Sequence, residues 1–110
     1  MKMTPELLDR LARRFAALAD ANRLRLIQHL KDGECRVGDL AEALDLPQPT
    51  VSRHLAMLRE VGLVGCRRQG TQAFYAVRDR SLFALCELVC GAVAKDARRQ
   101  LAALTPDQET

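Results

Sequence analysis

The segment from residue 38 to residue 62 constrains the fold most, because it contains two helical patterns separated by a tight break. Leu40 and Leu44 are four residues apart, which places both on one face of a first short helix. Leu46-Pro47 ends that helix, and Pro49 falls in the first turn of the next, where proline is tolerated. The second helix carries an apolar stripe for a core, made up of Val51, Leu55 and Leu58. Two short helices joined in this way are typical of a helix-turn-helix.

After Gly62 the hydrophobic pattern changes from the period of a helix to that of strands. Leu63–Arg68 and Gln72–Val77 are strand-like runs, and Gln69-Gly70-Thr71 between them supplies the glycine of a tight turn. A β-hairpin that follows a helix-turn-helix is typical of a wing. The sequence therefore predicts a mainly α-helical chain with a small β-hairpin, a winged helix-turn-helix.

Two helical segments precede this unit. Thr4-Pro5-Glu6 provides a cap, a first-turn proline and an early acid for a helix that runs to about residue 19. Asp20 caps a second helix that stops at Gly33. The residues of this helix expected in the core are Leu24, Ile27 and Leu30, together with Leu26. Glu34–Val37 is too short to classify and is compatible with an isolated strand.

The last segment, from about Ser81 to Leu104, has one long apolar stripe formed by Leu82, Cys86, Val89, Cys90, Val93 and Ala97. Little apolar surface remains inside one chain of 110 residues for this stripe to cover. We therefore expect a homodimer formed through the first and last helices. The whole chain, residues 1–110, is expected to be one domain with a polar tail over residues 105–110.

Composition bears on location and partners. Seventeen Lys and Arg against fourteen Asp and Glu give a net charge of +3, too small an excess to identify a nucleic-acid-binding protein by itself. No apolar run approaches the ~18 residues that span a bilayer, and the N-terminus lacks the apolar region of a secretion signal. We therefore expect a cytoplasmic protein with no membrane partner, whose four cysteines stay reduced.

The outer face of the second helix of the helix-turn-helix carries side chains that read bases in a DNA major groove. Glutamine suits adenine, arginine suits guanine, and serine or threonine suits phosphates or bases. A merely solvated polar face is the alternative, and the surrounding helix, break and hairpin make it the less favoured one. The predicted DNA contacts on this helix are Gln48, Thr50, Ser52, Arg53, His54 and Arg59, with Met57 on the same face.

Arg67 and Arg68 lie close to the tip of the hairpin. They are predicted to contact phosphate or an adjacent minor groove, which adds affinity more than sequence preference. The alternative is a charged edge that prevents other strands from pairing with the hairpin.

The block from Gln48 to Val64, with Gly33–Ala41 before it and the Arg67–Gly70 wing after it, closely resembles the ArsR/SmtB repressors. Phe74-Tyr75 matches as well, and the likeness extends over nearly the whole chain, weakening in the first helix and the tail. The resemblance implies a homodimeric repressor of double-stranded operator DNA that needs no cofactor to bind it. It also implies an inducer, either a metal, a metalloid or a reactive sulfur or oxygen species, that lowers DNA affinity.

Departures from the family pattern reduce the number of inducer sites that this chain could contain. Arsenite-sensing members often carry Cys-Val-Cys-Asp-Leu before the helix-turn-helix, whereas this chain has Arg36-Val37-Gly38-Asp39-Leu40, which supplies no thiolate. Zinc-sensing members place His and acidic ligands along the last helix, but His29 and His54 lie elsewhere, so a zinc site is not expected. Pro47 stands where relatives often have serine, so the usual hydroxyl cap of the second helix is missing.

Cys86 and Cys90 are four residues apart on the last helix, with β-carbons about 6 Å apart on one face. Two such thiolates can share one soft ion, As(III), Sb(III) or another thiophilic metal, with a third ligand from Cys35, Cys66 or the partner chain. Both cysteines are equally compatible with small apolar positions in a dimer interface. Cys35 fits a core position better than a ligand, and Cys66, at the base of the wing, is a weaker redox candidate.

Two regulatory functions stay open for the cysteines. The first is a repressor released from its operator when a soft metal or metalloid binds. The second is a repressor that senses oxidants or reactive sulfur through modified or linked cysteines. An enzyme is not expected, because neither His has a nucleophile or carboxylate partner at motif spacing and no phosphate-binding glycine loop is present.

Overall fold

The computed structural model describes residues 1–106, so the last four residues of the expected polar tail lie outside the described residues. The chain forms two compact units, Met1–Asp79 and the residues from Arg80 onward. That residues 1–110 form one domain stays a prediction.

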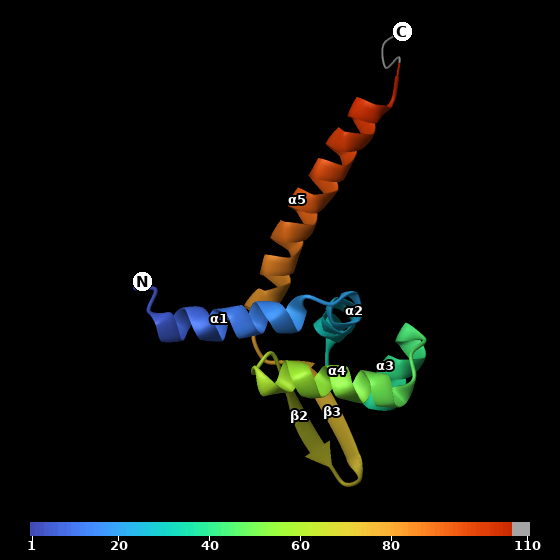
Figure 1. Cartoon of the computed structure of the whole chain (residues 1–110). Helices are drawn as coiled ribbons and strands as arrows, with labels where there is room; N and C mark the ends of the chain where they lie inside the picture. Colours follow the sequence, from blue (N-terminus) through green and yellow to red (C-terminus); the bar gives the residue numbers. More distant parts are fainter. Residues whose placement is uncertain (107–110) are drawn as a thin grey trace. The chain divides into compact units, whose positions relative to one another are not determined.

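The first unit combines α-helices with a small antiparallel sheet, as Figure 1 shows. Its elements, in chain order, are α1 (Pro5–Leu18), α2 (Ala21–His29), a 3-10 turn (Leu30–Asp32), β1 (Cys35–Arg36), α3 (Val37–Leu44), α4 (Gln48–Glu60), β2 (Val64–Gln69) and β3 (Gln72–Val77). The second unit contains α5 (Ser81–Leu104). The expected winged helix-turn-helix is thus present, with α3 and α4 as the helix pair and β2 and β3 as the wing.

The first two helices begin where capping residues predict. The Thr4 hydroxyl accepts a hydrogen bond from the Leu7 N–H at 3.2 Å. Asp20 Oδ1 accepts from the N–H groups of Arg23 and Asn22 at 3.1 and 2.9 Å, and the Arg23 bond contributes most to lowering the pKa of the Asp20 carboxyl. These bonds fix the start of each helix.

The end of α2 departs from the prediction. The α-helix stops at His29, and the chain tightens into the 3-10 turn before it reaches Gly33. Leu24, expected in the core, is 39% exposed. The helical period alone placed Leu24 on the apolar side, but the neighbouring elements cover only the adjacent Leu26, Ile27 and Leu30.

The break between α3 and α4 occupies three residues. Asp45 adopts a left-handed conformation (φ 55°) that ends α3. At the start of α4 the Pro47 carbonyl accepts hydrogen bonds from the N–H groups of Thr50 and Val51, at 3.0 and 3.2 Å. No side chain caps this helix, as the sequence predicted from proline at position 47.

The sheet has the strand order β1-β3-β2 and is antiparallel throughout. In the wing, Val64 lies opposite Val77 and Gln69 opposite Gln72, while Gly70 turns the chain with a positive φ of 62°. The short strand considered around residues 34–37 forms as β1 and pairs with β3. It ties the chain just before the helix-turn-helix to the wing.

The core of the first unit lies between α2, α3, α4 and the base of the wing. Its largest fully buried side chains are Leu26, Ile27, Leu30, Leu40, Val51, Leu55, Leu58 and Val64. All three apolar residues predicted for the inner face of α4 belong to this set. The core therefore fixes which side of α4 faces outward.

The apolar stripe of α5 is largely uncovered within a single chain. Leu82 is buried, but Val89 is 54% exposed and Val93 is 62% exposed. A helix with this much exposed apolar surface is suited to an interface. Among residues 1–106, no helix is both long enough and apolar enough to cross a membrane.

Replacing Leu55 by Ala is expected to lower the free energy of unfolding by about 2–5 kcal/mol, because it removes a fully buried side chain from beneath α4. Chemical denaturation measures this change, at one fixed protein concentration so that dimerisation does not shift the result. Glu60→Ala, at an exposed position of the same helix, serves as the control. Equal losses in the two variants would contradict the burial of Leu55.

Candidate nucleic-acid interface

Helix α4 turns a polar edge outward over its buried apolar underside. Gln48, Ser52, Arg53 and Arg59 are exposed, and Thr50 is half-buried. The Arg53 guanidinium donates to the Thr50 hydroxyl at 3.4 Å, a long contact that leaves its other donors available. This edge offers the donors and acceptors of a major-groove reader, on a helix whose rotation is fixed by the core.

His54, predicted as a DNA contact, lies on the side of α4 that faces α2. Its Nδ1 is 3.4 Å from an Arg23 guanidinium nitrogen, and the same nitrogen is 3.3 Å from the sulfur of Met57. The Arg23 Nε donates to the Ala17 carbonyl at the end of α1, at 2.6 Å. Arg23 therefore bridges α1 and α4, and His54 takes part in this bridge.

On the wing, the exposed side chain of Arg67 is held by contacts with neighbouring side chains of the same chain. Its Nε and one terminal nitrogen donate to the two Glu34 carboxylate oxygens, at 3.2 and 2.5 Å. Its other terminal nitrogen donates to the Gln69 amide oxygen at 2.9 Å. The guanidinium also lies over the Phe74 ring, 4.7 Å from its centroid.

Arg68 differs from its neighbour Arg67. Side chains alternate between the two faces of a strand, so Arg68 shares a face with Cys66, and Arg67 points to the other. Within residues 1–106, Arg68 is exposed and forms no ion pair. The positive charges of Arg68 and of Arg59, at the end of α4, both act to lower the pKa of the Tyr75 hydroxyl, against the larger effect of burial. The end of α4 and the wing thus bring cations to one neighbourhood.

Two of the four cysteines lie in the sheet. Cys35 on β1 and Cys66 on β2 both lie directly opposite Tyr75 on β3, so the three side chains form one row on a single face. Burial and the neighbouring Cys66 sulfur raise the pKa of the Tyr75 hydroxyl, and burial raises the pKa of the Cys35 thiol. Both thiols are half-buried.

The other two cysteines lie on α5, one turn apart as predicted. Cys86 is half-buried and Cys90 is exposed. Burial, and secondarily the charge of Cys90, raise the pKa of Cys86. Among the described residues, no three His, Cys, Asp or Glu side chains gather closely enough to hold a metal ion. Within the described residues, the α5 pair therefore offers two sulfur atoms and no third ligand beside them.

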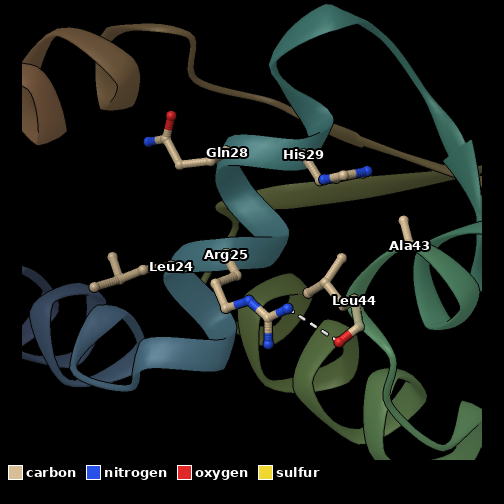
Figure 2. Close-up of a pocket in the computed structure, with 6 residues that line it drawn as sticks. All are labelled: Leu24, Arg25, Gln28, His29, Ala43 and Leu44. Atoms are coloured by element: carbon tan, nitrogen blue, oxygen red, sulfur yellow. Dashed lines mark hydrogen bonds between the residues drawn. The ribbon is translucent and has the colours of Figure 1, made fainter.

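A hollow of about 400 Å³ lies between α2 and α3 (Figure 2). Leu24 and Leu44 are among the residues that line it, and the Arg25 side chain donates to the Leu44 carbonyl at 3.0 Å. Arg25 also donates to the Asn22 side chain at 3.1 Å. Arg25 thus ties α2 to the last turn of α3, next to the break that leads into α4.

Comparison with known proteins identifies the family. The model of the bacterial regulatory proteins of the arsR family matches residues 20–65. The HTH-type transcriptional regulator CmtR of Mycobacterium bovis is 46% identical over 87 residues, which cover 78% of this chain and 74% of that protein. The chain belongs to the ArsR family. This family consists of DNA-binding transcriptional regulators, which confirms that the chain is a regulator and not an enzyme.

Two further ArsR-family comparisons bear on ligand and assembly. The arsenical resistance operon repressor of Escherichia coli is 50% identical over 62 residues, 56% of this chain and 53% of that protein. The homodimeric winged helix-turn-helix DNA-binding domain of a possible ArsR-family regulator from Mycobacterium bovis, solved by NMR, has a TM-score of 0.76 at 35% identity and covers 83% of this chain and 87% of that one. The chain spans between half and three quarters of the length of the curated relatives named here.

Three residues with side-chain contacts in the first unit, Arg23, Glu34 and Arg36, were not singled out in the sequence. Arg23 and Glu34 act on residues 31 and 33 positions away, and such distant pairs leave no periodic signal in the sequence. Arg36 pairs with Asp39 at 3.1 Å in the first turn of α3. This pair could have been predicted from the sequence, because an arginine three residues before an acidic residue at the start of a helix favours such an ion pair.

Replacing Arg23 by Ala is expected to lower the free energy of unfolding by about 1–2 kcal/mol, because it removes the charged donor to the Ala17 carbonyl and the bridge to α4. Arg23→Lys should lose most of the same free energy, since an ammonium group cannot reproduce the guanidinium fork. Denaturation at equal protein concentration measures both losses. Parent-like stability in both variants would show that the bridge is not formed.

Proposed function

We propose that the chain is a transcriptional repressor that binds palindromic operator DNA as a homodimer. The observation that carries this proposal is the exposed edge of α4, above the fully buried Val51, Leu55 and Leu58. Gln48, Thr50, Ser52 and Arg53 read bases from the first turns of α4, where recognition helices usually contact base edges. Arg59 and the wing contact the DNA backbone.

His54 acts in this proposal from the inner flank of α4. The sequence favoured a base contact for it, whereas its neighbours Arg23 and Met57 support a role in orienting the helix. Because His54 is held against α2, it helps to fix the orientation of α4. That orientation in turn determines which bases Arg53 can reach.

The dimer of this proposal is formed through α1 and α5. Apolar side chains are exposed on both helices, including Phe15 (49% exposed) on α1 and Leu88 (75% exposed) on α5. The homodimeric relative solved by NMR supports a two-fold assembly. Two recognition helices related by a two-fold axis would read the two halves of a palindrome.

Arg53→Ala is expected to weaken operator binding and to reduce the preference for operator over random duplex by about 1–3 kcal/mol, the discrimination of one bidentate arginine contact. Fluorescence anisotropy at one salt concentration measures binding to a palindromic promoter fragment and to a shuffled duplex. Lys2→Ala, which removes one positive charge from the N-terminal segment, is the control. If the parent protein shows no preference for the palindrome, the proposed function is wrong.

The inducer site of this proposal is the α5 pair, Cys86 and Cys90. Two thiols one helical turn apart suit a trivalent arsenic or antimony species or another thiophilic metal. The raised pKa of Cys86 keeps its thiol protonated near neutral pH, so the ligand has to displace that proton on binding. The arsenical resistance repressor of Escherichia coli, 50% identical over the matched segment, supports a soft inducer. Cys35 or Cys66 remains a candidate third ligand.

An oxidant or a reactive sulfur species is the second candidate inducer. The exposed Cys90 thiol is accessible to such reagents, and its neighbour Cys86 can resolve the first product. Mass spectrometry after treatment with arsenite or polysulfide distinguishes the two candidates, because one leaves a bound metalloid and the other a sulfur link.

Replacing Cys86 and Cys90 together by Ser is expected to abolish release of operator DNA by arsenite, antimonite, cadmium and polysulfide, while DNA affinity without inducer stays within about twofold of the parent. The typical coupling of ~1–3 kcal/mol predicts a loss of roughly 5- to 150-fold in inducer response. The control is Gln100→Ser, at an exposed position of the same helix that carries no thiol. Parent-like release from the double variant would rule out the α5 pair as the sensor.

A further inference from the structure

Contacts with Glu34 and Gln69 engage every guanidinium nitrogen of Arg67, an arginine that the wing would otherwise present to DNA. Glu34 takes two of the three guanidinium nitrogens, through both carboxylate oxygens, and Gln69 takes the third. A paired carboxylate of this geometry is among the stronger partners available to arginine. The Phe74 ring covers one face of the group.

Glu34 reaches the wing because β1 pairs with β3. Glu34 directly precedes Cys35, which lies opposite Tyr75, while Arg67 lies opposite Phe74. The carboxylate is therefore carried to the outer face of the wing by the strand pairing itself. The two side chains remain 40% and 51% exposed, so a DNA phosphate would approach the same place and meet the Glu34 charge.

Arg68 can be compared directly with Arg67, because both arginines belong to the same strand. Arg68 is the next residue of β2, carries the same charge and projects from the opposite face, where no carboxylate of the described chain is recorded in contact with it. The wing thus holds one arginine that is engaged and one that is available.

We propose that Glu34 withholds Arg67 from DNA, so that the wing contacts phosphate through Arg68 and Glu34 limits the affinity for operator and random DNA alike. This inference rests on the proposed DNA-binding function. It names a residue outside the helix-turn-helix and the wing as a determinant of affinity. Because phosphate contacts carry little sequence information, the effect is on affinity and not on base preference.

The test is the salt dependence of binding to a random duplex. Glu34→Gln, which keeps the size of the side chain and removes its charge, should steepen the slope of log K against log salt by about 0.9, the contribution of one added phosphate contact. Binding at 0.1 M salt should tighten by up to about eightfold. Arg67→Ala in the parent background should leave the slope unchanged, whereas Arg68→Ala should flatten it by about 0.9.

Two controls separate release of Arg67 from a general loss of negative charge. Glu42→Gln removes an exposed carboxylate from α3 and should leave the slope as in the parent. The double variant Glu34→Gln/Arg67→Ala should lose the gain of the single variant. Thermal unfolding of each variant shows that the fold is retained, and Glu34→Ala serves if the Gln amide still holds Arg67.

The outcomes distinguish this inference from the function on which it rests. If the parent binds duplex and Glu34→Gln and Glu34→Ala both bind with the same slope, or if Arg67→Ala alone flattens the slope, Arg67 is not withheld and the inference is wrong. If the double variant keeps the gain, the effect comes from another cation and the inference is equally wrong. A parent that binds no duplex overturns the proposed function, and this inference falls with it.

Discussion

The structure depends on the complete burial of one side of α4. Val51, Leu55 and Leu58 have no exposed surface and pack into the same core as Leu40 of α3 and Val64 at the base of the wing. Successive helical residues are rotated by about 100°, so fixing three of them fixes the direction of all the others. The side chains proposed to read bases need a direction that is set in advance, and here apolar burial sets it.

The elements could be predicted from the sequence because their signals are local. Caps at Thr4 and Asp20, the break at Pro47 and the glycine at position 70 act within a few residues, and each marks a boundary in the structure. Leu24 was misplaced because its burial depends on which neighbours cover α2, and periodicity carries no such information. The same limit explains why β1 was recognisable only as a short extended segment until its partner β3 was known.

The candidate site could be predicted in its residue types but not in its pairings. The outward edge of α4 follows from the stripe beneath it, whereas the partners of His54 and Arg67 lie more than 30 residues away in the chain. Both pairs reduce the freedom of a side chain that a sequence alone would assign to DNA. The exposed edge of α4 and the α5 cysteines also belong to different compact units, so the proposed induction requires a free-energy coupling between those units.

Tyr75 lies between Cys35 and Cys66 in the sheet, and this places the two thiols on non-adjacent strands. Strands are spaced by about 4.8 Å, so the α-carbons of the two cysteines are roughly 10 Å apart, beyond the span of a disulfide. Oxidation therefore cannot link the wing to β1 by a disulfide bond between these two cysteines. The aromatic spacer keeps the hairpin from being locked by its own thiols and leaves cross-linking chemistry to cysteines elsewhere in the assembly.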